Sequence, residues 1–102
     1  MRANEFLTES YEFFDTIVDQ IKAQVPAEEI WFHGSRATGA EHDESDWDIL
    51  VIVPDNIVGD EYINVTRILQ SIARRYENFD IQPARASNNI ARIAREEGKR
   101  ID

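Results

Sequence analysis

The sequence predicts an α+β fold, in which helices pack on a small mixed β-sheet to form an α/β sandwich. Three observations support this: a long first segment with helical periodicity, three short apolar segments rich in β-branched residues, and two further helical segments among and after them. With 102 residues, 42% of them hydrophobic, the chain is long enough for one core and short for two. We therefore expect a single domain spanning residues 1–102.

The first segment has the apolar pattern of one helix face. Its apolar residues recur at alternating steps of four and three, which predicts an amphipathic helix over residues 4–24 that ends at Pro26. The residues on this face are Leu7, Tyr11, Phe14, Val18, Ile21 and Val25. Additional apolar residues outside this pattern indicate that the helix packs on a sheet and does not form a coiled coil.

Three segments have the composition of buried strands. Residues 30–33 form the first, and residues 46–53 form the second, whose latter half is continuously apolar and β-branched. The third covers residues 79–82 and is expected to end at Pro83. Because only a short connection separates the first two strands, we expect them to be neighbours in the sheet.

Two more helices are predicted in the second half of the chain. Helical spacing of apolar residues indicates one over residues 60–76, and another is expected over residues 88–97, capped by Ser87 and stopped by Gly98. Three cations along this last helix are expected to form a solvated face, with contact to an acidic partner as the alternative: Arg92, Arg95 and Lys99.

Composition restricts the location and the partners of the protein. No cysteine is present, no basic segment followed by an apolar run opens the chain, and no apolar stretch is long enough for a membrane span. A cytoplasmic location without membrane association is therefore expected. The net charge of −9 disfavours nucleic-acid binding and favours cations.

The most informative stretch joins a glycine turn to a pair of carboxylates. Gly34 allows close approach of the backbone to a phosphate, and Ser35 adds a hydroxyl and an N–H donor. Asp46 and Asp48 are two residues apart on a predicted strand, so both carboxylates point to one face while Trp47 points to the other. Two hard oxygen ligands in this arrangement suit Mg²⁺.

A third carboxylate, Asp80, opens the last predicted strand. If that strand pairs beside residues 46–53, Asp80 completes a triad with Asp46 and Asp48. A metal held by such a triad would neutralise a triphosphate and stabilise the leaving pyrophosphate in an in-line displacement. The pattern as a whole therefore indicates phosphoryl chemistry.

The segments GSRATG and SDWDILV resemble the signature of the nucleotidyltransferase family, and the whole chain is similar to its minimal stand-alone domains. The resemblance implies a nucleotidyltransferase-like fold in which Gly34 and Ser35 bind the triphosphate. It also implies that Asp46 and Asp48 bind the metal and that Asp80 is the third acid. The chain departs from the family at Thr38, where an arginine is common, so no phosphate-binding role is carried onto that position.

The resemblance also implies a reaction and a partner. The reaction is the Mg²⁺-dependent transfer of a nucleoside monophosphate, AMP from ATP, to an acceptor hydroxyl, which we expect on a partner protein because the chain is small and acidic. Such domains are often paired with a helical HEPN-type protein in toxin–antitoxin modules, in which the transferase-like member is the antitoxin. The rival interpretation is an inert binding module that neutralises its partner by contact. Self-association and a half-site contributed to a larger transferase also stay open.

Four residues with functional potential have more ordinary interpretations. His33 and His42 have no second His or Cys at a zinc-like spacing, so a packed or exposed role is expected for each. Trp31 and Trp47 could stack on a base, but aromatic residues on strands more often belong to the core.

Overall fold

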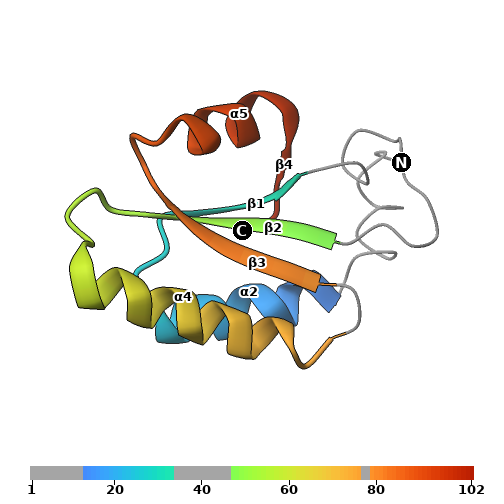
Figure 1. Cartoon of the computed structure of the whole chain (residues 1–102). Helices are drawn as coiled ribbons and strands as arrows, with labels where there is room; N and C mark the ends of the chain where they lie inside the picture. The colour runs from blue at the N-terminus through green and yellow to red at the C-terminus, as the bar shows by residue number, and fades with distance from the viewer. Residues whose placement is uncertain (1–12, 34–46, 77–78) are drawn as a thin grey trace.

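A computed structural model describes residues 13–33, 47–76 and 79–102, where a four-stranded sheet has helices on both faces (Figure 1). This architecture confirms the predicted α+β sandwich. In chain order the elements are α2 (Phe13–Gln24), β1 (Glu29–His33), β2 (Trp47–Val53), α4 (Gly59–Ala73), β3 (Phe79–Arg85), α5 (Asn89–Glu97) and β4 (Lys99–Arg100).

The sheet is mixed and has the order β3-β2-β1-β4. Strand β2 is antiparallel to β1 and parallel to β3, and the short β4 pairs antiparallel with β1. The expected pairing of the first two strands is therefore confirmed, and the third predicted strand does lie beside the second. Parallel neighbours need a crossover connection, which α4 provides between β2 and β3.

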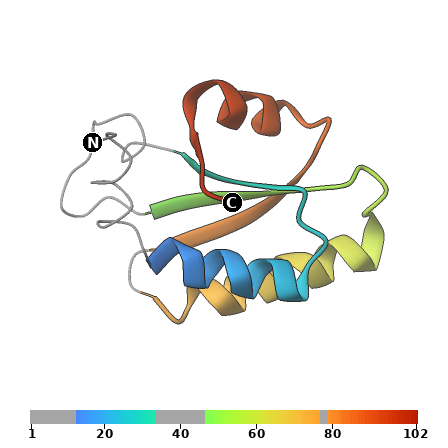
Figure 2. The ribbon, with the colours of Figure 1, turned by 180° about the vertical axis from the view of Figure 1, so that it is seen from behind.

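The helices divide into two layers. Helices α2 and α4 lie side by side on one face of the sheet, and α5 covers part of the other face (Figures 1 and 2). Strand alternation sends Ile49 and Val51 of β2 into the larger core under α2 and α4, while Leu50 and Ile52 point to α5. The smaller core under α5 consists of Leu50, Ile52, Ala84, Ala91 and Ala94.

The helix boundaries differ in part from those expected. The structure describes α2 from Phe13, so the start of the predicted helix over residues 4–24 lies outside the described residues. Helix α4 ends at Ala73 instead of residue 76, because the Tyr76 N–H bonds to the Ala73 carbonyl in a tight turn. Its first residue, Gly59, has φ of 60°, a left-handed conformation that favours glycine. No helix within the described segments has the length and apolarity to cross a membrane.

Strand β3 is longer than expected, and the prediction that it ends at Pro83 is wrong. The strand continues through Pro83 to Arg85. It lies at the edge of the sheet, where a proline nitrogen that points outward breaks no ladder hydrogen bond. The Tyr62 hydroxyl of α4 donates a hydrogen bond of 3.0 Å to the Pro83 carbonyl, so this outer edge is fastened to the helix.

Helix α5 is capped by Asn88, and the expected cap at Ser87 is wrong. The Asn88 side chain accepts a hydrogen bond of 2.8 Å from the Ile90 N–H, as an N-cap should. The Ser87 N–H is used elsewhere, because it donates to the Asp55 carboxylate at 2.9 Å. The helix stops before Gly98 as predicted.

The cations in and after α5 do not form one solvated face. Arg92 is exposed and pairs with Glu96 one turn later, as expected for such a face. Arg95, however, forms an ion pair of 2.9 Å with Glu29 of β1, which fastens α5 to the sheet. Lys99 lies in β4, so its predicted place on the helix surface is wrong.

Candidate active site

Asp48 and Asp80 occupy paired positions on neighbouring strands. Their Cα atoms are partners in the parallel β2–β3 ladder, where strands lie about 4.8 Å apart. Both side chains belong to the face that α5 covers further along the strands, and both residues are half-buried. Trp47 and Phe79, one residue before each acid, lie on the opposite face in the larger core. The two carboxylates therefore share one solvent-accessible region at the end of the sheet.

His33 extends this pair into a row across three strands. It is the Cα partner of Asp48 in the antiparallel β1–β2 ladder, so the sequence of positions across the sheet is His33, Asp48, Asp80. Residues directly opposite one another in such a ladder point to the same face. The spacing of residues in the sequence does not predict that His33 lies beside Asp48. Only the pairing of β1 with β2 brings the two residues together. We call these three residues the sheet-end row.

Gln82 is a further residue of this face that the sequence analysis did not select. Its side-chain amide donates a hydrogen bond of 2.9 Å to Oδ1 of Asp80, two residues earlier on β3. The bond restricts rotation of the Asp80 carboxylate. Strand alternation was the available signal, since residues two apart on a strand share a face.

A layer of aromatic rings lies on the other side of the sheet from this row. Phe32, Trp47 and Phe79, one from each strand, stack side by side: the Phe32 and Trp47 centroids are 5.2 Å apart, and those of Trp47 and Phe79 are 6.0 Å apart. Phe14 of α2 contacts all three, at 5.5, 5.6 and 6.2 Å. Because Trp47 and Phe79 directly precede Asp48 and Asp80, this packing fixes the backbone that carries both acids.

Close backbone contact at Gly98 holds the end of β1. A Cβ atom at this position would lie 2.7 Å from the Ala94 carbonyl oxygen and 2.8 Å from that of Phe32. It would also lie 3.3 Å from Cβ of His33. The absence of a side chain therefore allows the exit from α5 to pass directly over the last residues of β1, from which the chain continues to Gly34.

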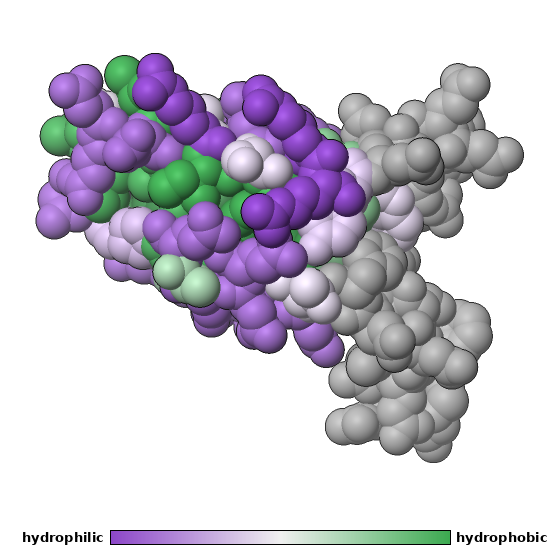
Figure 3. Space-filling view, turned by 90° about the horizontal axis from the view of Figure 1, so that it is seen from below, coloured by the Kyte–Doolittle hydropathy of each residue, from purple (hydrophilic) through white to green (hydrophobic). Residues whose placement is uncertain are grey.

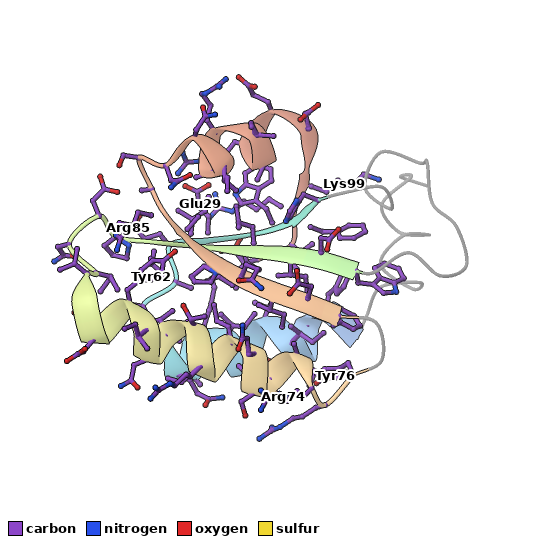
Figure 4. All side chains as sticks on the ribbon, in the orientation of Figure 1. Glu29, Tyr62, Arg74, Tyr76, Arg85 and Lys99 are labelled. Atoms are coloured by element: carbon purple, nitrogen blue, oxygen red, sulfur yellow. The ribbon has the colours of Figure 1, made fainter. Side chains whose placement is uncertain are left out.

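An open hollow of about 290 Å³ adjoins Asp80 at the edge of the sheet. Its lining comes from the C-terminal end of α4, the turn after it and the start of β3: Gln70, Ala73, Arg74, Tyr76, Phe79 and Asp80. Figure 4 shows Arg74 and Tyr76 together at this end of α4. The hollow combines two aromatic walls with one cation and one amide.

Glu29 carries charge on the α5 side of the sheet, but its contacts are structural. The hydrogen bond from Arg95 lowers the pKa of the Glu29 carboxyl, against the effect of partial burial, and a 2.8 Å hydrogen bond from the Trp31 indole lowers it further. This carboxylate is thus already bonded twice within the protein. It links α5 and β1.

The remaining predicted site residues, Gly34, Ser35 and Asp46, lie outside the described residues. Of the predicted acids, the structure brings together Asp48 and Asp80. Within the described part of the chain, no three His, Cys, Asp or Glu side chains are gathered as a metal site. Asp48 and Asp80 nevertheless provide hard carboxylate oxygens on one face, which is the ligand chemistry that Mg²⁺ prefers.

Comparison with known families gives a match over most of the chain. Residues 15–101 match the profile of the family described as "Polymerase beta, Nucleotidyltransferase". The match includes every residue of the sheet-end row and every predicted site residue. No curated protein sequence matches the chain.

Solved structures with the same fold include two toxin–antitoxin complexes. One is described as the toxin–antitoxin with AMP-PNP and has a TM-score of 0.57 and 20% sequence identity, covering 84% of this chain and 69% of that chain. The other is a mutant of the toxin–antitoxin MntA-HpeT in which two aspartates are changed to glutamate; it has a TM-score of 0.56 and 19% identity over the same shares. At these identities the likeness concerns the fold.

Proposed function

Because the chain belongs to the polymerase beta nucleotidyltransferase family, we propose that it transfers a nucleoside monophosphate, AMP from ATP, to a hydroxyl group of a partner protein in the presence of Mg²⁺. The observation that carries the proposal is the in-register pairing of Asp48 and Asp80 on one accessible face of the sheet. Two carboxylates at paired positions of adjacent strands can both be ligands of one divalent cation.

Asp46, Asp48 and Asp80 would hold the metal. Their carboxylates suit Mg²⁺, which binds through a few protein carboxylates together with waters and substrate phosphates. The ion would supply charge neutralisation on the triphosphate and on the departing pyrophosphate. The aromatic layer beneath the sheet keeps Asp48 and Asp80 fixed in relation to each other, which removes a reorganisation cost from the reaction.

The other residues of the site would bind the nucleotide and move a proton. Gly34 and Ser35 would provide N–H and hydroxyl donors for the triphosphate, immediately after the end of β1. The acceptor oxygen attacks the α-phosphorus, the bond from that phosphorus to the bridging oxygen breaks, and pyrophosphate leaves. Asp80 accepts the proton of the attacking hydroxyl, while the hydrogen bond from Gln82 orients its carboxylate.

Two observations favour a protein acceptor. The net charge of −9 repels nucleic acid, and the similar solved structures are toxin–antitoxin complexes, one of them with AMP-PNP. The mutant complex carries changes at two aspartates separated by one residue, the same spacing as Asp46 and Asp48. We propose that this protein acts in the cytoplasm as the antitoxin of a helical HEPN-type toxin, and that the toxin is the acceptor.

The decisive experiment uses ATP labelled at the α-phosphate, Mg²⁺ and the protein encoded beside this one. Label should pass to that partner with wild-type protein and not with Asp48→Asn/Asp80→Asn. Asp15→Asn/Asp19→Asn, which removes the same charge from the exposed face of α2, is the matched control and should transfer normally. If wild type neutralises the partner without any transfer of label, the contact-only binding module replaces the enzyme.

A further inference from the structure

The outer face of α4 carries a stripe of side chains that leads to the hollow beside Asp80. Ile63, Arg67, Gln70 and Arg74 follow one another at steps of four, three and four residues, which places them on one helix face. Ile63 is 50% exposed, and the other three are exposed as well. Gln70 and Arg74 also line the hollow. We call these four residues the α4 stripe.

The two arginines of the α4 stripe are unusual in their lack of partners. Within the described residues, the side chains of Arg67 and Arg74 make no hydrogen bond or ion pair. The other described arginines do: Arg75 with Gln20, Arg85 with the Ile57 carbonyl, Arg92 with Glu96, Arg95 with Glu29 and Arg100 with Asp102. On a chain of net charge −9, two uncompensated cations on one exposed face can attract an anionic surface.

The hollow at the end of the stripe is small and open to solvent. Its volume is about 290 Å³. Tyr76 and Phe79, whose ring centroids are 5.5 Å apart, provide its aromatic walls. The Tyr76 hydroxyl is held by a 3.0 Å hydrogen bond from Gln20, which limits movement of that wall.

Asp80 and His33 lie at opposite ends of the sheet-end row. Asp80 lies on β3, the edge strand, whereas His33 lies on β1 at the end that leads to Gly34. The hollow adjoins Asp80 and none of the other residues of the row. A group in the hollow therefore lies beside β3, and not beside β1, which leads to Gly34.

We propose that the α4 stripe docks the acceptor protein through an acidic segment of that protein, which places a side chain of the acceptor in the hollow beside β3. This deepens the proposed nucleotidyl transfer and rests on it. Arg67 and Arg74 pair with the acidic residues, and Ile63 supplies an apolar contact at the far end of the stripe. That apolar contact and the overall negative charge favour a protein over an RNA end.

The hydrophobic strip between α2 and α4 is a different surface. Figure 3 shows it from below with hydrophilic side chains along both margins. The α4 stripe lies on the exposed face of α4 and continues to the hollow.

The test uses a fluorescein-labelled helical peptide of glutamate, alanine and leucine with one central tyrosine. Its anisotropy is followed on titration with wild type, Arg67→Glu/Arg74→Glu and Arg92→Glu/Lys99→Glu. The last variant is the matched control, because it reverses two charges that lie in α5 and β4 and not in α4. The stripe variant should weaken peptide binding by about tenfold or more, and the control by less than about twofold. The affinity of both double variants for Mg-ATP, measured by calorimetry, should stay within about twofold of that of wild type. Thermal melts verify that the variants are folded.

Other outcomes identify which inference fails. Equal weakening by both double variants, or no binding of the acidic peptide to wild type, overturns the docking inference alone. So does tighter binding of a labelled oligouridine that depends on Arg67 and Arg74, since the acceptor would then be nucleic acid. Absence of Mg-ATP binding by wild type overturns the proposed nucleotidyl transfer, whatever the peptide does.

Discussion

Asp48 and Asp80 share one register position of the parallel β2–β3 ladder, and their side chains lie on the same face of the sheet. They lie 32 positions apart in the sequence but only about one strand spacing apart in space. The α4 crossover creates this relationship. Under the proposed function, the two acids would act on one substrate, which can be measured in several ways.

The first prediction concerns nucleotide binding. Asp46→Asn/Asp48→Asn should weaken Mg-ATP binding by about tenfold or more, because the acidic protein repels the triphosphate when the metal is not held. Calorimetry with and without EDTA provides the measurement. The control Asp15→Asn/Asp19→Asn should bind Mg-ATP as wild type does. Tight, metal-independent binding in the active-site variant would contradict the site.

The second prediction separates binding from chemistry. Asp80→Asn should leave Mg-ATP binding largely intact and lower the transfer of label by about 100-fold or more, because a positioned proton acceptor contributes that much. Gln82→Ala, which removes the hydrogen bond to the Asp80 carboxylate, should lower transfer by a smaller factor. Single-turnover transfer and calorimetry are measured in parallel. Equal transfer by Asp80→Asn and wild type would remove Asp80 from the reaction.

The third prediction compares two glycines. Gly98→Ala should destabilise the fold by about 2 kcal/mol, because the new Cβ would overlap two backbone carbonyl oxygens that have little freedom to move. Gly59→Ala meets no atom within 4 Å and should cost only about 1 kcal/mol, through its positive φ. Urea unfolding of both variants provides the test. A greater loss at Gly59 would show that the contact over β1 is not as tight as described.

Asp102 is the basis of the fourth prediction. Its side chain is 1% exposed and accepts hydrogen bonds from the Ile30 N–H at 3.0 Å and from Arg100 at 2.8 Å, while Lys22 of α2 lies 3.1 Å away. Burial raises the pKa of this carboxyl, but the hydrogen bonds from Arg100, Ile30 and Lys22 outweigh burial and lower the pKa to about 2. The carboxylate thus connects α2, β1 and β4.

The lowered pKa of Asp102 predicts a specific acid dependence of stability. A group whose folded pKa is depressed stabilises the fold above its unfolded pKa, here 3.8, and loses that contribution as the pH falls through about 2. We expect this carboxylate to account for about 1 kcal/mol of the decrease, after allowance for solvent screening. Urea unfolding at several pH values should show a shallower decrease for Asp102→Asn than for wild type. Parallel pH profiles for the two proteins would contradict the prediction.

Local patterns were sufficient for much of the fold. The strands around Ile49 and Ile81 and the helix around Leu69 were expected because apolar spacing distinguishes a strand from a helix. One error occurred where a tertiary neighbour decides the outcome, because Pro83 is tolerated on β3 as an edge strand. The error at the start of α5 was local: the side chain of Asn88, and not that of Ser87, accepts the capping hydrogen bond from the Ile90 N–H.

The sequence by itself determined which residue types are present for chemistry and in what local spacing: a glycine and a serine after a strand, two acids two residues apart, and a third acid at a later strand. Spacing along one strand is local, so alternation predicts a shared face for Asp46 and Asp48, although Asp46 lies outside the described residues. Only the tertiary structure decided that Asp80 lies beside Asp48, that His33 completes the row, and that Arg67 and Arg74 lead to a hollow at its edge. These relationships depend on strand order and crossover, which join residues far apart in the chain and leave no periodic signal in the sequence.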